Sequence, residues 1–370
     1  MFAASAGDRQ VILFVSGEYP PDIGGVGDYT HHLRSALAAL GRQTSVLSRR
    51  QVRRWDARAL VWLLRHAPRT GIVHIQYQAA AFDLLGDVCL TPSLLRRFRP
   101  RLRTVTTFHD ARVPYLFPRA GPLRAAAVRL LARASDAVIA ADERDLRALG
   151  GPSPRHHHVP IGPNVACSPP ADFQREAFRS RLGLEGDDLA LVYFGLRNAS
   201  KGLDLVLEVF QRVLSRRPRA RLLLLGEQVG ASDPSDRQTA ARIRGRIERF
   251  GEHILQTGWL PEPELSTYLL AGDVALLPYA DGASGRRGSL LACAEHGLPI
   301  VSTQPAAAEV APFILATRPE AAVLSQAVLD AAADPVPLRA SSRALAQRAS
   351  WSRIARAHVD IYDRLLYCRP

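Results

Sequence analysis

The chain joins a strand to a helix in Val192-Tyr-Phe-Gly-Leu-Arg-Asn-Ala-Ser-Lys-Gly-Leu-Asp204, the stretch that indicates its fold. An apolar strand leads through Gly195 into a short loop with Arg197 and Lys201, and a helix follows at once. A glycine after a strand lets the backbone turn tightly, and the free amides and positive dipole of the next helix start attract anions. The stretch therefore predicts one βα unit with a place for phosphate at its junction.

The same alternation extends to both sides of this stretch. Short apolar runs rich in β-branched residues alternate with segments of helix length, which is typical of parallel sheets covered on both faces. In the first half the predicted strands are Val11–Ser16, Thr44–Leu47, Ile72–Tyr77, Thr104–Phe108, Ala137–Ala140 and His157–Ile161. In the second half they are Leu189–Phe194, Ala220–Leu225, Ile254–Thr257, Val274–Pro278, Ile300–Thr303 and Phe313–Ala316.

The alternation is interrupted once, at residues 150–170, where six prolines stand among glycine and polar residues. We therefore predict an α/β protein with two Rossmann-like, doubly wound parallel-sheet domains, at 1–165 and 187–340, joined by a linker at 166–186. Residues 341–370 carry apolar side chains at three- and four-residue steps from Trp351 to Leu365, which predicts a closing helix. Ligands of such sheets bind at the carboxyl ends of the strands, and two facing domains create a cleft.

The charge of the chain is strongly positive, with 48 basic against 35 acidic residues and a net charge of +13. Only one of the 48 is a lysine, Lys201. A basic surface suits nucleic acid, anionic phospholipid or a nucleotide-linked substrate. The arginines are spread over the whole chain with few aromatic neighbours, so we expect no nucleic acid and keep a nucleic-acid-binding protein as a remote third alternative.

Location and metal chemistry are predicted from what the sequence lacks. No apolar run approaches the ~18 residues of a spanning helix, and no secretory signal opens the chain, so we expect a cytoplasmic protein. Peripheral contact with the anionic inner face of a membrane stays open. The four cysteines form no Cys-x-x-Cys pair, which predicts small buried residues in place of a metal site or a disulfide framework.

The first domain offers two candidate loci. Glu18-Tyr-Pro-Pro-Asp-Ile-Gly-Gly-Val-Gly-Asp-Tyr-Thr30 follows the first strand, and Gly25 and Gly27 would let the backbone approach a ligand at a helix start. Thr30 and Arg49 stand where a dinucleotide fingerprint needs glycine and an acid, which disfavours NAD. His109 follows the fourth strand, where a polar side chain can hold a substrate hydroxyl.

The second domain offers two places that favour phosphate. Lys201 is a compact, flexible ammonium in a chain that otherwise uses arginine, which indicates a particular role. Gly288 and Ser289 begin a helix whose free amides can hold a diphosphate, and Arg286 and Arg287 add positive charge.

Together these residues resemble a family 4 glycosyltransferase of the GT-B fold, of the glycogen synthase-like group. The resemblance covers essentially the whole chain, because the motifs occur in the family's order. They are Pro20-Pro-x-x-Gly-Gly-Val-Gly-x-Tyr29, Thr107-Phe-His109, Val159-Pro-Ile-Gly-Pro-Asn164, Gly195-x5-Lys201-Gly-Leu203, Thr257-Gly-Trp-Leu260, Leu265-x-x-Tyr-x-x-Ala-Gly-Asp-Val274 and His296-Gly-Leu-Pro-Ile-Val-Ser-Thr303. The resemblance implies a retaining enzyme that moves sugar from a nucleotide-sugar co-substrate to a hydroxyl of a glycan or lipid-linked acceptor. It also implies no metal and no other cofactor, and a role in polysaccharide, glycolipid or cell-envelope glycan synthesis.

The resemblance also implies roles for single residues. Gly25, with Gly27 beside it on the acceptor-side domain, would lie against the donor diphosphate and acceptor, and His109 would contact the donor sugar. Arg197 and Lys201 would neutralise the departing diphosphate, which is the event that develops charge. The turn of Gly258, Trp259 and Leu260 would border the nucleobase, and the last helix would pack back on the first domain.

The sequence departs from the family pattern at two places. Leu196 follows the glycine directly, with Arg197 one place later, and Ser284 and Ala292 stand where the family has its Glu-x7-Glu pair. Glu295, one helical turn from Ala292, is the candidate replacement. We expect an active variant of the family, and the alternative is a catalytically silent relative that binds nucleotide-sugar.

Overall fold

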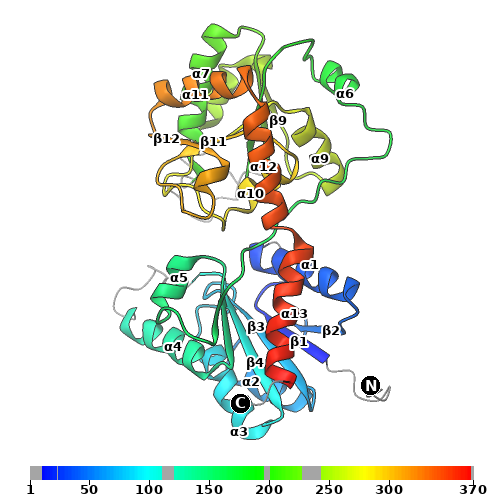
Figure 1. The fold of residues 1–370 in the computed structure, drawn as a ribbon, viewed down its shortest axis with the longest axis vertical. Coiled ribbons are helices and arrows are strands. Elements are labelled where there is room, and N and C mark those ends of the chain that lie inside the picture. The colour runs from blue at the N-terminus through cyan, green and yellow to red at the C-terminus, as the bar shows by residue number, and fades with distance from the viewer. Residues whose placement is uncertain (1–10, 23, 111–120, 196–200, 227–242, 368–370) are drawn as a thin grey trace. The chain divides into compact units, whose positions relative to one another are not determined.

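The structure is a computed structural model that describes residues 11–22, 24–110, 121–195, 201–226 and 243–367. The chain divides into two compact units (Figure 1). The N-terminal unit comprises Met1–Gly162 with Ser350–Pro370, and the C-terminal unit is Pro163–Ala349. Each unit contains a six-stranded parallel sheet, so the predicted α/β class with two doubly wound parallel sheets is confirmed.

The sheet of the N-terminal unit has the strand order β2-β1-β3-β4-β5-β6. Its strands are β1 Val11–Ser16, β2 Thr44–Leu47, β3 Gly71–Tyr77, β4 Leu102–Phe108, β5 Ala137–Ala140 and β6 His156–His158. Its helices are α1 Gly25–Ala39, α2 Ala57–His66, η1 Asp87–Leu90, α3 Thr91–Phe98, α4 Gly121–Ala134, α5 Glu143–Ala148 and α13 Trp351–Tyr367. The interior strands β3 and β5 are buried along their whole length, since helices cover both faces.

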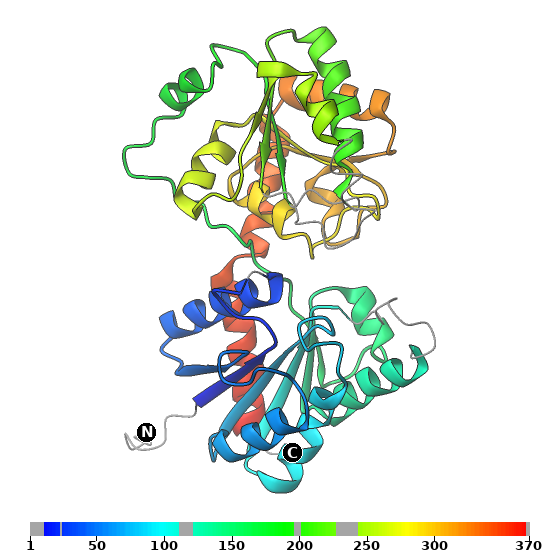
Figure 2. The ribbon, with the colours of Figure 1, turned by 180° about the vertical axis from the view of Figure 1, so that it is seen from behind.

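The two faces of this sheet are covered by different helices. On one face α1 and α13 lie side by side and pack on Phe14, Ile72 and Val105 (Figure 1). On the other face α2, α3 and α4 pack on alternate residues of the same strands, among them Val15 and Val73 (Figure 2). The alternation follows because successive side chains of a strand point to opposite faces.

The sheet of the C-terminal unit has the strand order β12-β11-β10-β7-β8-β9. Its strands are β7 Ala190–Phe194, β8 Arg221–Leu225, β9 Ile254–Gln256, β10 Val274–Leu277, β11 Ile300–Thr303 and β12 Leu315–Thr317. Its helical segments are α6 Arg175–Arg181, α7 Leu203–Arg216, η4 Gly251–His253, α9 Glu262–Ala271, α10 Gly288–Glu295, η5 Ala311–Phe313, α11 Ala321–Ala333 and α12 Val336–Arg348.

Part of the predicted linker at 166–186 is a helix that belongs to the C-terminal unit. Helix α6 is held there by ion pairs, because Arg175 and Arg179 donate to the two carboxylate oxygens of Asp273 at 2.7 and 2.9 Å. Arg179 is 5% exposed and also donates to the carbonyls of Ala271 and Asp188. Contacts about 90 residues away in the sequence therefore fix this segment.

The predicted closing helix at 341–370 is in fact two helices in different units. Helix α12 ends at Arg348 in the C-terminal unit, and α13 begins at Trp351 in the N-terminal unit, where it packs on α1. The cysteine prediction is correct for Cys89 and Cys293 and wrong for Cys167, which is exposed on the connection before α6. Cys368 lies outside the described residues.

Candidate functional site

Two glycines and a helix start meet at the carboxyl edge of the C-terminal sheet. Gly195 follows β7 with a φ of 146°, and Gly226 follows the neighbouring strand β8 with a φ of 105°. A Cβ on Gly226 would lie 2.7 Å from the carbonyl oxygen of Gly195, and one on Gly195 would lie 3.7 Å from Oγ of Ser289. Because these glycines have no side chains, the backbone beside the first turn of α10 is open to a ligand. Parallel sheets bind their ligands at this edge.

Tyr279 follows β10 at this edge, and two cationic side chains lie against its ring, one from the segment before α7 and one from the segment before α10. Lys201 Nζ is 5.1 Å from the ring centroid, and the Arg287 guanidinium carbon is 4.6 Å from it. Tyr279 is held at both ends. Its phenol oxygen lies 2.8 Å from Ser289 Oγ, and its backbone carbonyl accepts a hydrogen bond from the Thr303 hydroxyl at 2.6 Å. One aromatic ring thus holds together the cations that the sequence placed 86 residues apart.

The surroundings of Lys201 make its charged form less favourable than it is in water. Burial lowers its pKa from 10.5 to about 8, and Arg287 adds to the lowering, while Asp281 opposes it. The Asp281 carboxylate forms an ion pair with Arg287 and is half-exposed. Two cations and one carboxylate leave a net positive charge, which an anionic ligand would balance.

The start of α10 adds donors to this charge. No side chain caps the helix, whose N-cap residue is Arg287. The amides of Gly288 and Ser289 belong to the first turn, where α-helices leave their N–H groups without intrahelical acceptors. A Cβ on Gly288 would lie 3.0 Å from the side chain of Asn164, so glycine lets the connection after Gly162 approach this turn. Arg286 is half-buried in the same loop.

The loop that lacks the expected glutamates is fixed by another carboxylate. Ser284 and Ala292 are both buried. The amide of Gly285, next to Ser284, donates to Oε1 of Glu309 at 3.2 Å. Glu295 lies at the other end of α10, next to Cys167, where burial raises the pKa of the Cys167 thiol and the Glu295 charge adds to the effect. The structure therefore does not bring Glu295 to the cations.

The predicted nucleobase side lies at the edge of the same sheet. Gly258, Trp259 and Leu260 follow β9, two strands from β7 in the sheet order. Two strand spacings amount to about 10 Å, a span that a nucleoside can bridge. The Trp259 indole is 68% exposed, whereas large apolar side chains of this unit are mostly buried. Its flat face is free to stack on a planar ligand.

In the N-terminal unit the two predicted glycines occupy different surroundings. Gly25 begins α1 with open space where a Cβ would stand. Gly27 is buried, and a Cβ there would lie 3.2 Å from the backbone of Glu18 and Tyr19. Gly25 can therefore meet a ligand, while Gly27 lets the preceding loop pack closely on the helix.

His109 follows β4 at the carboxyl edge of the N-terminal sheet. Its Nε2 lies 2.8 Å from Oε1 of Gln76, and the Tyr29 ring packs edge-on against the imidazole at 4.7 Å. Removal of water from around the ring lowers the pKa of His109 to about 3, with His358 adding to the effect. His109 is therefore a neutral imidazole at physiological pH and can act as a hydrogen-bond partner but not as a cation.

Tyr279 and Gln76 were not predicted from the sequence as site residues, and one residue that was predicted is not described by the structure. Arg197 lies outside the described residues. Tyr279 was missed although an aromatic residue directly after a strand and before an arginine pair is a usable signal. Gln76 was missed too, and its signal is the alternation of polar and apolar residues in Ile72-Val-His-Ile-Gln-Tyr77, a strand without exposed residues.

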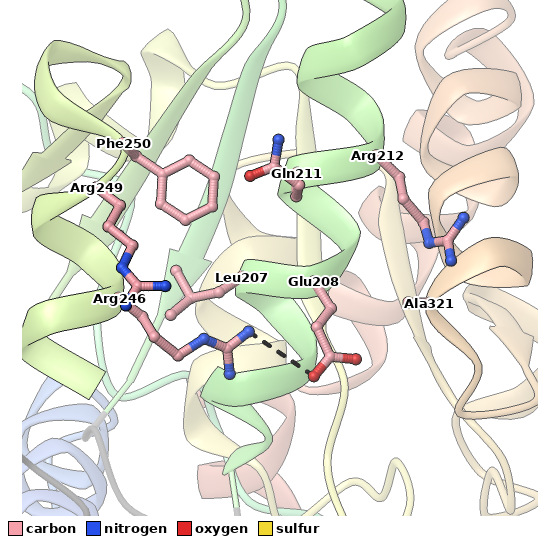
Figure 3. Close-up of a pocket in the computed structure, with 8 residues that line it drawn as sticks. All are labelled: Leu207, Glu208, Gln211, Arg212, Arg246, Arg249, Phe250 and Ala321. Atoms are coloured by element: carbon pink, nitrogen blue, oxygen red, sulfur yellow. Dashed lines mark ion pairs between the residues drawn. The ribbon is translucent and has the colours of Figure 1, made fainter. Parts of the chain in front are cut away.

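A separate pocket of 420 Å³ lies beside α7 (Figure 3). Its lining residues are Leu207, Glu208, Gln211, Arg212, Arg246, Arg249, Phe250 and Ala321. Arg246 is paired with Asp204 at 2.6 Å and with Glu208 at 3.7 Å. None of the predicted site residues lines this pocket.

Metal binding and membrane spanning have no support in the described part of the chain. Within those residues no three His, Cys, Asp or Glu side chains gather as metal ligands would. Among the described helices none combines the length and apolar character needed to cross a bilayer.

Comparison with known proteins relates the second half of the chain to glycosyltransferases. Residues 188–334 match the family model described as Glycosyl transferases group 1. The protein YtcC of Bacillus subtilis, a glycosyltransferase by name, is 27% identical over 100 residues. That match spans 27% of this chain and only 24% of YtcC. The match to a glycosyltransferase family model thus lies within the C-terminal unit, which also contains all the described cations of the candidate site.

Solved structures extend the likeness to the whole fold. Sucrose-phosphate synthase from Thermosynechococcus elongatus has a TM-score of 0.71 at 19% identity, covering 98% of this chain and 100% of that one. HepE of Anabaena in complex with UDP and glucose has a TM-score of 0.70 at 15% identity, covering 95% and 98%. The two Rossmann-like domains of the GT-B fold are therefore confirmed for this chain.

Proposed function

We propose that this protein is a retaining glycosyltransferase that moves a sugar from a nucleotide-sugar donor to a hydroxyl of a glycan or lipid-linked acceptor. The observation that carries the proposal is the pair of cations, Lys201 and Arg287, held on Tyr279 beside the uncapped start of α10. Cleavage of the donor leaves negative charge on a diphosphate, and preorganised cations and amides stabilise that charge as it develops.

The remaining parts of the donor have candidate contacts. The exposed Trp259 indole would stack on the nucleobase, and Arg197 and Arg286 would add charge at the diphosphate. The open backbone at Gly25 and the neutral His109 of the N-terminal unit would contact the transferred sugar. Gly27 would keep the Gly25 loop in place. Neither metal nor another cofactor has a part in this scheme.

Retention rests on the resemblance to the family. Glu295 is displaced from the cations, so we propose that the enzyme works without a carboxylate at the positions of Ser284 and Ala292. Anomeric analysis of the product by proton NMR tests retention, because an inverted product would exclude it.

A catalytically silent relative that binds nucleotide-sugar is the second candidate, and the buried Ser284 and Ala292 motivate it. Thermal shift with nucleoside diphosphates and their sugars tests binding first. A ligand at one hundred times its Kd adds about 2.7 kcal/mol to the free energy of unfolding. Stabilisation of wild type but not of Lys201→Ala supports the site, and no response to any nucleoside diphosphate overturns it. Turnover with a stabilising donor then separates an enzyme from a silent relative.

We also propose peripheral contact with anionic lipid through the outer surface of α2, α3 and α4. These three adjacent helices contain seven arginines, two in α2, two in α3 and three in α4, and no Asp or Glu. Large apolar side chains are exposed among them, including Phe98 at 59% and Leu123 at 76%. Cations mixed with exposed apolar side chains suit the interface of an anionic bilayer. This contact would place the enzyme at the cytoplasmic face of a membrane.

Vesicle flotation tests the membrane contact. We expect binding to vesicles with phosphatidylglycerol and little binding to pure phosphatidylcholine. A Phe98→Ser, Leu123→Ser double variant should bind less, while Val336→Ser, an equally exposed residue on α12, should bind like wild type. Equal binding to both vesicle types, or no loss in the double variant, contradicts the proposal.

A further inference from the structure

A continuous chain of buried polar side chains connects His109 to the C-terminal helix. Nε2 of His109 lies 2.8 Å from Oε1 of Gln76, and the amide nitrogen of Gln76 lies 3.2 Å from Nε2 of His74. Nδ1 of His74 lies 2.6 Å from the phenol oxygen of Tyr362 on α13. His74 and Gln76 are completely buried and Tyr362 is 1% exposed, so no water competes for these bonds.

The positions of the protons in this polar chain follow from its donors and acceptors. The Gln76 amide donates to His74, so Nε2 of His74 carries a lone pair, which the Thr107 hydroxyl also reaches at 2.7 Å. The single proton of neutral His74 is then on Nδ1 and is donated to Tyr362. The Gln76 carbonyl oxygen can only accept, so His109 donates from Nε2.

The second ring nitrogen of His109 is the one available to a ligand. Nδ1 has no partner among the described residues and is not one of their buried unsatisfied atoms. With the proton on Nε2, Nδ1 presents a lone pair and accepts a hydrogen bond. The opposite tautomer would present an N–H and donate one.

We propose that Tyr362, acting through His74 and Gln76, fixes His109 in the Nε2–H tautomer, so that its Nδ1 accepts from a substrate hydroxyl. The inference rests on the proposed function in assigning His109 to the sugar. Gln76, His74 and Tyr362 are positioning residues, since they act through His109. The C-terminal helix thereby determines which kind of hydrogen bond the site offers.

The coupling follows because an N–H on Nε2 of His74 would face the amide nitrogen of Gln76, which is also a donor, at 3.2 Å. The Thr107 hydroxyl suits either tautomer, since it can donate or accept. Without the Tyr362 oxygen, an N–H on Nδ1 of His74 would be buried without an acceptor, which costs about 1–3 kcal/mol. The His74 proton would move to Nε2 and be donated to a rotated Gln76 carbonyl. The Gln76 amide nitrogen would then donate to Nε2 of His109, whose proton would reside on Nδ1. Each imidazole still carries one proton, so the charge does not change.

NMR of protein labelled with 15N-histidine tests this coupling, because two-bond proton–nitrogen spectra distinguish the Nε2–H and Nδ1–H tautomers. We expect the Nε2–H form of His109 in wild type and the Nδ1–H form in Tyr362→Phe, a variant that does not touch His109. Tyr29→Phe is the matched control. It keeps the ring that packs on His109 and loses only a hydroxyl that lies 3.4 Å from His358, so the tautomer should stay Nε2–H.

Gln76→Leu is a second variant that breaks the chain next to His109, and we expect a mixture of tautomers there. An unchanged His109 tautomer in both Tyr362→Phe and Gln76→Leu, with melting curves that show a folded protein, overturns the inference. With a competent donor, Tyr362→Phe should lower kcat about 10-fold and leave the Kd for a nucleoside diphosphate unchanged. The spectra need no donor, so they test the coupling even if the chain transfers no sugar.

Discussion

The phenol oxygen of Tyr279 lies 2.8 Å from Oγ of Ser289, which joins the end of β10 to the first turn of α10. Because Lys201 and Arg287 both lie against the ring of Tyr279, this bond also fixes two cations relative to the helix amides. Burial raises the pKa of the Tyr279 phenol, which therefore remains neutral and does not cancel the positive charge beside it. Hydrogen bonds within the protein hold this arrangement.

Replacement of Lys201 by alanine should abolish transfer and leave the fold intact. The ammonium stabilises charge on the leaving diphosphate, and loss of one such group costs about 100-fold or more in kcat. Steady-state kinetics and melting curves measure the two effects. Arg212→Ala is the matched control, since it removes a cation from the same unit at the separate pocket. Near-normal turnover in Lys201→Ala would refute the site.

Anion binding should weaken as the pH rises through about 8, the lowered pKa of Lys201. If only the ammonium form binds, the affinity for a nucleoside diphosphate falls about tenfold for each pH unit above the pKa. Calorimetric titrations between pH 7 and 9.5 measure this decline. In Lys201→Arg the decline should vanish because a guanidinium stays charged. An equal decline in both proteins would assign the titration to another group.

The same pKa shift has the opposite effect on the stability of the ligand-free protein. The pKa of Lys201 is lower in the folded state than its ordinary 10.5, so between about pH 8 and 10.5 the unfolded chain binds more protons. The Lys201 contribution therefore makes the free energy of unfolding rise with pH in this window. Comparison of denaturant curves for wild type and Lys201→Met isolates this contribution, and a difference that falls with pH would contradict it.

Gly202 should not tolerate alanine. Its φ is 68°, and a Cβ would lie 2.0 Å from the carbonyl oxygen of Pro278. We expect Gly202→Ala to lower the free energy of unfolding by about 1–3 kcal/mol and to move Lys201 away from Tyr279. Gly245→Ala is the control, because it adds a Cβ with no atom within 4 Å on a helical residue. The control should be neutral or stabilised by up to about 1 kcal/mol in chemical denaturation.

Trp259 should report nucleotide binding by its fluorescence. It is 68% exposed, whereas Trp55 is 2% exposed, so a base that stacks on Trp259 would quench the accessible emission. Trp259→Ala should weaken binding about 10-fold, since stacking on an aromatic ring is worth about 1–3 kcal/mol. Trp259→Phe should retain most of the affinity while losing the signal. Full affinity in the alanine variant would remove Trp259 from the base site.

Central strands could be predicted from sequence because burial on both faces makes them apolar throughout. The interior strands β1 and β5 have the predicted bounds. The edge strand β6 is His156–His158, a polar segment whose short ladder depends on β5, and its prediction extended too far. Helix α6 escaped notice because Asp273, which holds it, is almost 100 residues away.

The residues of the candidate site also divide into those that local sequence reveals and those that depend on distant partners. Gly25, Lys201 and the arginine pair stand out locally, through backbone freedom or an unusual residue type. Gln76 and Tyr362 do not, because their roles arise from partners 33 and 288 residues distant. The displacement of Glu295 from the cations also depended on the length of α10, which sets its two ends apart.

The N-terminal unit is built from two separate stretches of the sequence, which determines how this protein can be divided or recombined. A fragment that ends at Gly162 would lack α13 and lose the part of the core in which Ile354, Ile361 and Tyr362 pack beside α1. Pro163–Ala349, in contrast, is one uninterrupted insert. The C-terminal unit can therefore be exchanged between relatives as one continuous segment, whereas the N-terminal unit has to be assembled from two segments, one from each end of the chain.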